Sequence, residues 1–112
     1  NVRYLRPDEV EEKPDLITAD LSFISLTLVL PALAAVVREE GLILALIKPQ
    51  FEAGRDNVGK GGVVKNSAVH RQVIDKIKRF SRGEKLNVIG VRESRLRGPA
   101  GNREFFILLK KP

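Results

Sequence analysis

The sequence has no cysteine and no long hydrophobic run. Without cysteine the chain cannot be held together by disulfides, and no segment approaches the roughly 18 consecutive apolar residues of a membrane-spanning helix. The first residues also lack the basic region and apolar stretch that are typical of a secretion signal. We therefore expect a cytoplasmic protein without stable membrane insertion.

What the sequence does have is an excess of positive charge. Its 112 residues include 20 Lys and Arg against 14 Asp and Glu, which gives a formal net charge of +6. This excess favours binding to polyanions such as nucleic acid or an acidic membrane surface. Many soluble domains carry excess lysine without such a function, so charge alone leaves both interpretations open. The length and the 43% of hydrophobic residues are those of one soluble globular domain.

Short apolar runs alternate with helical patterns along the chain. An apolar run of four to eight residues indicates a strand, and apolar residues at spacings of three and four indicate a helix. The second helical pattern is the clearest, with Asn66 or Ser67 as its cap and Gly83 at its end. The polar first 15 residues, interrupted by proline, indicate an exposed turn or one short helical turn. The predicted strands cover 16–19, 42–48, 86–94 and 104–111, and the predicted helices cover 25–41 and 66–83.

The first predicted helix contains a proline. Ser25 is a plausible N-cap, and Gly41 after two glutamates would end the helix. Pro31 lies between them, and proline disturbs a helix interior. Either the helix starts near Pro31 after a turn, or it bends there.

The order of these elements predicts an α/β fold. Alternating buried strands and helices imply right-handed crossovers and a mostly parallel sheet. The last two strands would pair as an antiparallel hairpin or lie on either side of an intervening strand. The run at 42–48, apolar until its last residue, suits a strand covered on both faces. In such a sheet ligands bind outside the carboxyl ends of the strands, where Asp20, Lys48 and the glycine-rich loop at 54–65 fall.

The glycine-rich loop contains the spacing of a nucleotide-binding P-loop. Gly54, Gly59 and Lys60 match the pattern G-x-x-x-x-G-K. A P-loop, however, follows its strand almost at once, and its lysine precedes Ser or Thr. Here Gly54 comes six residues after Lys48, and Lys60 precedes Gly61. The sequence therefore argues against a P-loop.

Charged residues stand at the ends of three predicted strands. Lys48 could act as a general base, or it could be an ordinary lysine in water. Asp20 could bind a substrate or cap the following turn, and Glu104 alone would be a routine solvated charge. The three together favour a shared site without establishing that they converge.

Three segments resemble the TlyA family, whose hemolysin-named members are similar to FtsJ-type RNA 2′-O-ribose methyltransferases. They are "ADLSFISLTLVLP", "LIKPQFEAGRDNVGKGGVV" and "GPAGNREFF". The resemblance implies part of a Rossmann-like methyltransferase fold, mostly parallel with an antiparallel carboxyl-terminal strand. It further implies S-adenosylmethionine as the cofactor and ribosomal RNA or a ribosomal subunit as the partner.

The resemblance also implies roles for individual residues. FtsJ-type enzymes carry a Lys-Asp-Lys-Glu tetrad, and Asp20, Lys48 and Glu104 match its last three members. Lys48 is then the candidate general base, with Asp20 and Glu104 orienting it or the ribose. Asp20, Leu21 and Ser22 are expected to contact the cofactor. The first lysine and a glycine-rich cofactor segment belong to an amino-terminal half that this chain does not contain, and an S4-like domain usually precedes that half.

Further residues are expected to bind RNA. Arginines and lysines in two loops could form a rim that grips phosphates. Phe51 could stack on a base, although a plug that fills the core beneath its loop is the favoured interpretation. His70 is expected at the surface or as a cap, and no cluster with metal-ligand spacing surrounds it. The rim would comprise Arg55, Lys60, Lys65 and Arg103, with Arg95 and Arg97 beside them.

Two other interpretations remain open. The chain could be a hemolysin-like membrane-active protein, or a non-catalytic RNA-binding fragment. Because half of the nucleotide-binding sheet is absent, we expect the isolated chain to bind S-adenosylmethionine weakly or not at all. We also expect that it could form a homo-oligomer through an exposed edge of its first strand.

Overall fold

The computed structural model describes residue 6 and residues 12–112. Most of the polar segment expected to form a turn at 1–15 lies outside these residues. The strands and helices elsewhere coincide closely with the predicted ones. The strands are β1 (Leu16–Ala19), β2 (Leu42–Ile47), β3 (Asn87–Glu93) and β4 (Phe105–Lys110), and the helices are α1 (Leu26–Val36) and α2 (Ser67–Gly83).

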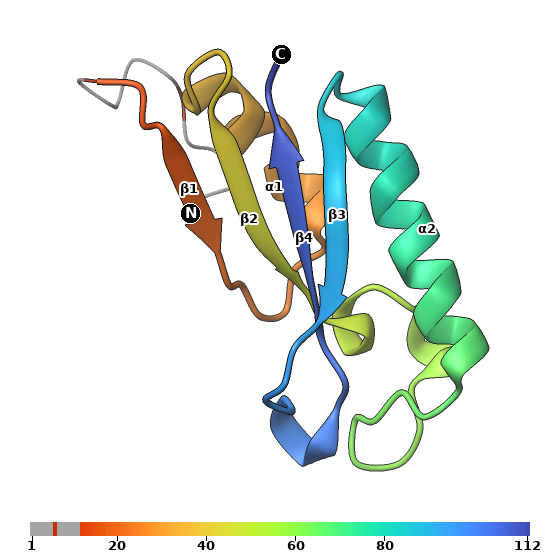
Figure 1. Ribbon diagram of the computed structural model, residues 1–112. Coiled ribbons are helices and arrows are strands. Elements are labelled where there is room, and N and C mark those ends of the chain that lie inside the picture. Colours follow the sequence, from red (N-terminus) through yellow and green to blue (C-terminus); the bar gives the residue numbers. More distant parts are fainter. Residues whose placement is uncertain (1–5, 7–11) are drawn as a thin grey trace.

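The strands form a sheet in the order β1-β2-β4-β3 (Figure 1). β1 runs parallel to β2, with Leu16 beside Leu42, whereas β4 is antiparallel to both β2 and β3. Three strands therefore point one way and only β4 opposes them. This confirms the predicted mostly parallel sheet with an antiparallel carboxyl-terminal strand, and it shows that the last two strands form a hairpin.

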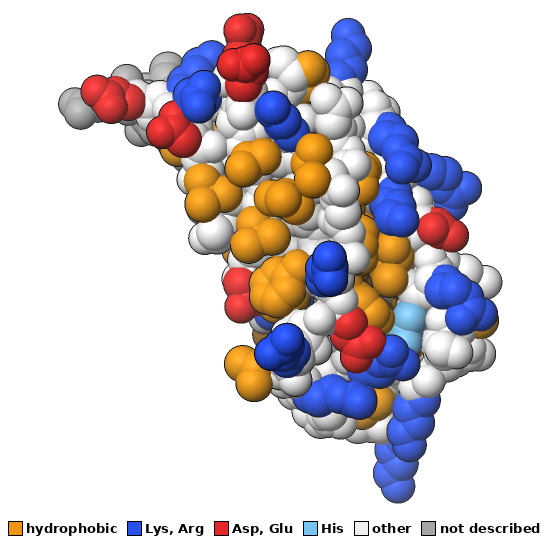
Figure 2. Space-filling model, in the orientation of Figure 1, with side chains coloured by type: hydrophobic (Ala, Val, Ile, Leu, Met, Phe, Trp, Pro, Cys, Tyr) orange, Lys and Arg blue, Asp and Glu red, His pale blue; other side chains and the backbone are white. Residues whose placement is uncertain are grey.

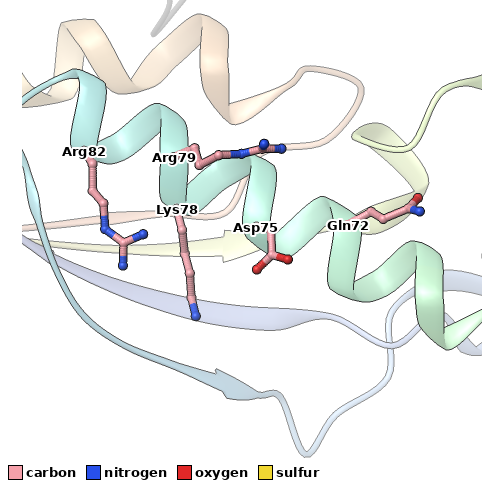
Figure 3. A pocket seen from close by; sticks show the side chains of 5 residues that line it. All are labelled: Gln72, Asp75, Lys78, Arg79 and Arg82. Carbon is pink, nitrogen blue, oxygen red and sulfur yellow. The ribbon is translucent and has the colours of Figure 1, made fainter.

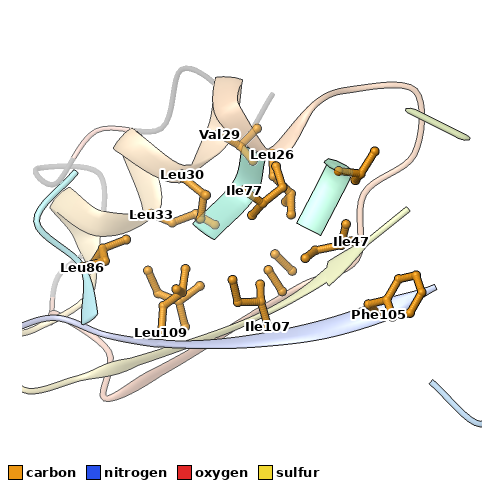
Figure 4. Packing of buried hydrophobic residues seen from close by; sticks show 14 of the residues in the cluster. Leu26, Val29, Leu30, Leu33, Ile47, Ile77, Leu86, Phe105, Ile107 and Leu109 are labelled. Atoms are coloured by element: carbon orange, nitrogen blue, oxygen red, sulfur yellow. The ribbon is translucent and has the colours of Figure 1, made fainter. Parts of the chain in front are cut away.

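Both helices pack on the same face of the sheet, and the core lies between them (Figure 4). Residues on this face alternate with residues on the other face, as the period of a strand requires. Ile43, Ala45 and Ile47 of β2 are fully buried against the helices. The remaining large side chains of this core come mainly from Val29, Leu30, Leu33, Ile77, Ile107 and Leu109.

The other face of the sheet is apolar but open. The alternate residues of β2 are only half-buried, and Phe106 beside them is 38% exposed. Figure 2 shows hydrophobic side chains gathered over this face. The prediction that β2 is covered on both faces is therefore wrong for the part of the chain that the structure describes, because α1 and α2 both return over the same side.

β1 is an edge strand within the described residues. It pairs only with β2, and its Leu16 is 53% exposed while Ala19 is buried. The short strand was predicted as buried, which holds for its last residue only. Its other side is unpaired within the described residues, as the expected exposed edge of the first strand requires.

The helix starts agree with the predictions better than the ends do. The Oγ of Ser25 accepts a hydrogen bond from the Thr27 amide, and the side chain of Asn66 caps α2 in the same way. α1 contains Pro31 in its interior, so the helix does not begin there. It ends at Val36 rather than at Gly41, which is a correction. The chain instead makes a tight turn up to Gly41, where a Cβ would lie 2.7 Å from the Val37 side chain.

No helix in residues 12–112 combines the length and the hydrophobicity needed to cross a membrane.

Candidate functional site

Two of the predicted site residues meet at one edge of the sheet. Asp20 follows β1 and Lys48 follows β2, and because these strands are parallel their carboxyl ends lie side by side. The Nζ of Lys48 is 2.5 Å from Oδ1 of Asp20 and donates a hydrogen bond to Oγ of Ser22 at 3.1 Å. The Lys48 side chain is only 11% exposed, whereas that of Asp20 is 68% exposed. The pair thus presents an open carboxylate and an ammonium that is mostly enclosed.

Glu104 stands apart from this pair. It is buried just before β4, and within the described residues no lysine or arginine lies within ion-pair distance of it. Its Oε2 instead accepts a hydrogen bond from Nε2 of Gln50 at 2.8 Å. A solvated Glu104, the simpler of the two interpretations, is therefore ruled out. The structure joins Glu104 to the Lys48 segment through an amide.

Gly98 packs directly against the Glu104 carboxylate. A Cβ at this glycine would lie 2.1 Å from Oε2 of Glu104. The backbone at Gly98 has a φ of −80°, which any residue can adopt. Space, not backbone conformation, therefore requires glycine here.

Gln50 and Glu52 are site residues that sequence reasoning missed. The Glu52 carboxylate accepts hydrogen bonds from Oγ of Ser25 at 2.6 Å and from the Leu26 amide at 2.8 Å, and Nζ of Lys76 lies 3.1 Å away. Its side chain is almost completely buried. Glu52 thereby ties the loop after Lys48 to the amino end of α1, which follows the Asp20–Ser22 segment. An acid in a loop is usually solvated, so the sequence carried no signal for this contact.

Hydrogen bonds to Asn102 and His70 hold the carboxyl-terminal end of the glycine-rich loop in place. Asn102 accepts a hydrogen bond from the Val64 amide at 3.0 Å and donates to the carbonyls of Gly62 and Pro99. Nε2 of His70 lies 2.8 Å from the Val64 carbonyl. Two loops that are far apart in sequence are thus joined through one buried asparagine. His70 is buried as well, so its expected place at the surface is wrong.

The predicted RNA-binding residues fall into two groups. Arg55, Lys60 and Lys65 are exposed, and the two lysines line a hollow of about 300 Å³. Arg103 is half-buried and donates to Glu93, with 2.5 Å between NH2 and Oε1. This hydrogen bond from Arg103 lowers the pKa of Glu93, and the charge of Arg103 lowers it further. Arg103 is therefore already paired, while the other three are available to an anion.

Phe51 is not part of the core. Its ring packs on that of Phe23 with 4.9 Å between the centroids and 51° between the planes. Phe23 is 89% exposed and holds a φ of +63°, a conformation uncommon for a phenylalanine. The favoured plug interpretation of Phe51 is therefore wrong. The two rings form an aromatic pair beside the Asp20–Lys48 edge instead.

No group of three or more His, Cys, Asp or Glu side chains in the described part of the chain could hold a metal ion.

Comparison with known proteins agrees with this geometry. The model of the FtsJ-like methyltransferase family matches residues 1–111. The chain belongs to the FtsJ-like methyltransferase family. The predicted resemblance is thereby confirmed, and so is the methyltransferase fold.

Two curated proteins are similar over nearly the whole chain. The 16S/23S rRNA (cytidine-2′-O)-methyltransferase TlyA of Mycobacterium tuberculosis is 41% identical over 98% of this chain, which spans 41% of TlyA. A candidate rRNA methyltransferase of Bacillus subtilis, YqxC, is 42% identical over 100% of this chain and 40% of its own length. The chain thus spans about two fifths of the curated relatives that it matches.

Solved structures agree with the fold. A candidate hemolysin from Streptococcus thermophilus is 42% identical with a TM-score of 0.94, over 99% of this chain and 40% of that one. An S-adenosylmethionine-dependent methyltransferase from Clostridium acetobutylicum has 11% identity and a TM-score of 0.59, over 99% of this chain and 62% of that one. The second likeness shows the fold alone. The likeness to the Clostridium acetobutylicum structure agrees with a methyltransferase-type fold for this FtsJ-like chain.

Proposed function

We propose that the chain is the carboxyl-terminal part of an rRNA ribose 2′-O-methyltransferase that uses S-adenosylmethionine. The observation that carries this proposal is the Asp20–Lys48 pair at the carboxyl edge of the parallel strands. Membership of the FtsJ-like family supports methyl transfer, and the name of the TlyA relative supports the ribose of rRNA as the acceptor. A cytoplasmic location follows from that substrate.

The residues at this edge fit the cofactor. S-adenosylmethionine supplies a methyl group on a positively charged sulfur, and a carboxylate is suited to lie near such a charge. Asp20 has an open carboxylate at the end of β1, where sheets of this type bind ligands. We assign Asp20, Leu21 and Ser22 to the cofactor side of the site.

Lys48 is suited to take the proton of the ribose hydroxyl as the oxygen attacks, after its own ammonium has released a proton to solvent. A base must lie within hydrogen-bond reach of the proton it removes, and Lys48 ends at the same edge as Asp20. Once protonated, its ammonium would be stabilised by Asp20 and directed by Oγ of Ser22. Glu104, held by Gln50, would position the ribose from the other side.

The exposed basic residues and the aromatic pair suit an RNA substrate. Arg55, Lys60 and Lys65 would attract phosphates regardless of base sequence. Phe23 and Phe51 offer an exposed apolar surface beside the site, on which an unstacked base could lie. Arg103 would contribute only after leaving Glu93.

We further propose that another part of the protein completes the site. It would supply the first lysine of the tetrad and the glycine-rich cofactor segment, and an S4-like domain would precede it. The open edge of β1 and the open apolar face of the sheet support this proposal. The isolated chain should then bind S-adenosylmethionine weakly, and it should self-associate through β1.

The test is methyl transfer by the full-length protein that carries this chain. With labelled S-adenosylmethionine and rRNA, Lys48→Ala should reduce kcat about 10²- to 10⁴-fold, the usual contribution of a general base. Lys48→Arg keeps the positive charge but cannot give up its proton, so it should be equally slow. Transfer by either variant at the parent rate would refute Lys48 as the base. Transfer to a base instead of a ribose would refute the proposed acceptor.

The hemolysin names of some relatives raise the alternative of membrane activity. α2 is the more amphipathic of the two helices. Its apolar side packs into the core, where Val69, Val73 and Ile77 are buried, so this side is not available to a membrane. We therefore expect no dye release from liposomes by the purified protein. Release at low concentration would favour the alternative.

A further inference from the structure

We propose that the outer face of α2 binds the sugar–phosphate backbone of RNA, at a surface separate from the Asp20–Lys48 edge. This inference rests on the proposed function, because it names a second contact with the same substrate. It concerns a helix whose charges the proposed chemistry does not use.

α2 carries five lysines and arginines but one acidic residue, Asp75. Only Lys76 is committed to a partner, since it pairs with the buried Glu52. Among the described residues, no acid lies within ion-pair distance of the other four. These four are Arg71, Lys78, Arg79 and Arg82.

Three of the four unpaired cations line a hollow on the helix. A hollow of about 370 Å³ is lined by Lys78, Arg79 and Arg82, together with Gln72 and Asp75. Figure 3 shows the side chains of Lys78 and Arg82 extending in the same direction from successive turns of α2. Their charges therefore lie side by side, with the single carboxylate of Asp75 one turn away.

Helix stability explains this arrangement only in part, since Arg82 in the last turn is favoured by the helix dipole and Asp75 has a favourable spacing to Lys78 and Arg79. Lys78 and Arg82, however, are four residues apart, and like charges at that spacing destabilise a helix. The apolar stripe of Val69, Val73 and Ile77 already fixes α2 on the sheet. The outer charges add nothing to that packing, so they are free to serve a ligand.

The surface fits RNA better than a lipid headgroup layer. A membrane-bound amphipathic helix inserts its apolar face, and that face of α2 is buried in the core. Phosphates along an RNA strand match a row of cations, and Asp75 and Gln72 beside them can accept hydrogen bonds from ribose hydroxyls. DNA lacks those 2′-hydroxyls. The mixture of cations and acceptors thus suits RNA in particular.

The position of α2 also suits one continuous RNA path. The helix begins just after Lys65, at the same edge of the sheet as Lys48, and its 17 residues run back along the sheet. At a rise of about 1.5 Å per residue it is about 25 Å long. An RNA strand bound along α2 could therefore extend into the site while α2 holds the part outside it.

The experiment compares two triple variants of the full-length protein. Lys78→Gln/Arg79→Gln/Arg82→Gln removes the cations of the hollow. Lys13→Gln/Lys110→Gln/Lys111→Gln removes the same charge at the opposite end of the strands from Lys48, together with a hydrogen bond from Lys111 to the Val37 carbonyl. Affinity for a single-stranded rRNA fragment is measured without cofactor at several salt concentrations, and circular dichroism confirms that each variant is folded.

The α2 variant should bind RNA more weakly. The plot of log affinity against log salt concentration should become less steep by about 2, because each of the three lost phosphate contacts contributes about 0.7 for single strands. The control variant should leave the slope unchanged. Equal changes in both variants, or none in either, would overturn the proposal. The proposal would also be overturned if the α2 variant lost binding to phosphatidylserine vesicles but bound RNA as well as the parent does.

Methyl transfer separates this inference from the function on which it rests. At saturating RNA the α2 variant should keep the parent kcat and show a raised KM, since the helix does not touch the reacting atoms. If the parent transfers methyl groups and the α2 slope is unchanged, the surface alone is refuted. If the parent transfers none and the slope still falls, the proposed function fails while the RNA surface stands.

A further variant tests the role of the acceptor. Asp75→Ala should reduce the preference for RNA over DNA of the same sequence. An unchanged preference would overturn the assignment of ribose contacts to α2.

Discussion

The two faces of the sheet consist of similar apolar residues, but one face is buried and the other is exposed to solvent. On the face beneath α1 and α2, Ile107 and Leu109 have no exposed surface, whereas on the other face Leu16 and Phe106 remain open to solvent. Leucine and phenylalanine gathered on an uncovered face form an apolar patch of the kind found at interaction surfaces. The stability of this chain therefore comes from one face, and the second face is suited to an interface.

The largest expected difference lies between two neighbours on β4. Ile107→Ala should lower the free energy of unfolding by about 2 to 5 kcal/mol, because it leaves a cavity in the finished core. Leu108→Ala, on the open face, should cost about 1 kcal/mol, since much less apolar surface is lost. Urea unfolding of both variants checks this. Equal losses would show that the open face is covered after all.

A smaller effect is expected from Glu52, which fastens the helical layer to the loop after Lys48. Glu52→Ala removes the acceptor for Ser25, Leu26 and Lys76 and should cost about 1 to 3 kcal/mol. Asp56→Ala in the exposed loop is the matched control and should stay within about 0.5 kcal/mol of the parent. A Glu52 variant as stable as this control would show that the covered side does not depend on the contact.

The open face can be altered with less effect on folding. Leu44→Thr/Phe106→Thr should lower the free energy of unfolding of this chain by about 1 to 2 kcal/mol, less than a cavity in the core, and should reduce any self-association through that face. Thr18→Lys on β1 instead tests association through the strand edge. Sedimentation of the three proteins distinguishes the two routes. If neither variant changes the sedimentation of an associating parent, another surface must hold the copies together.

The smallest expected effect concerns the β3–β4 hairpin. Arg103 lowers the pKa of Glu93 in the folded protein, so the pair stabilises the fold above the ordinary pKa of glutamate and this contribution is lost as the pH falls through the lowered value. Arg103→Gln should return the pKa of Glu93 toward its ordinary value. An NMR titration of the Glu93 carboxyl measures this, and an unchanged pKa would show that Arg103 is not its cause.

The sequence predicted what depends on near neighbours. Apolar runs and caps placed β1, β2, α2 and the start of α1, since a strand or a cap is decided within a few residues. The charged ends of β1 and β2 converge, as parallel strands require.

Contacts between distant residues could not be predicted in the same way. Glu52 meets Ser25 and Gln50 meets Glu104 across 27 and 54 positions. Burial of His70 and the pairing of Phe51 with Phe23 likewise depend on how loops fold back. The residues of β2 are apolar on both faces of the strand, so the sequence does not predict which face the helices cover.

The carboxylate of Glu104 fills the space that a side chain at position 98 would need. A methyl group added to the glycine would alter no charge and no hydrogen-bonding atom, yet it would have to displace the carboxylate. The residue sizes at these two positions are therefore coupled: alanine at position 98 would require the Glu104 carboxylate to move, or a shorter acid in its place. Natural variation at one position should accompany variation at the other.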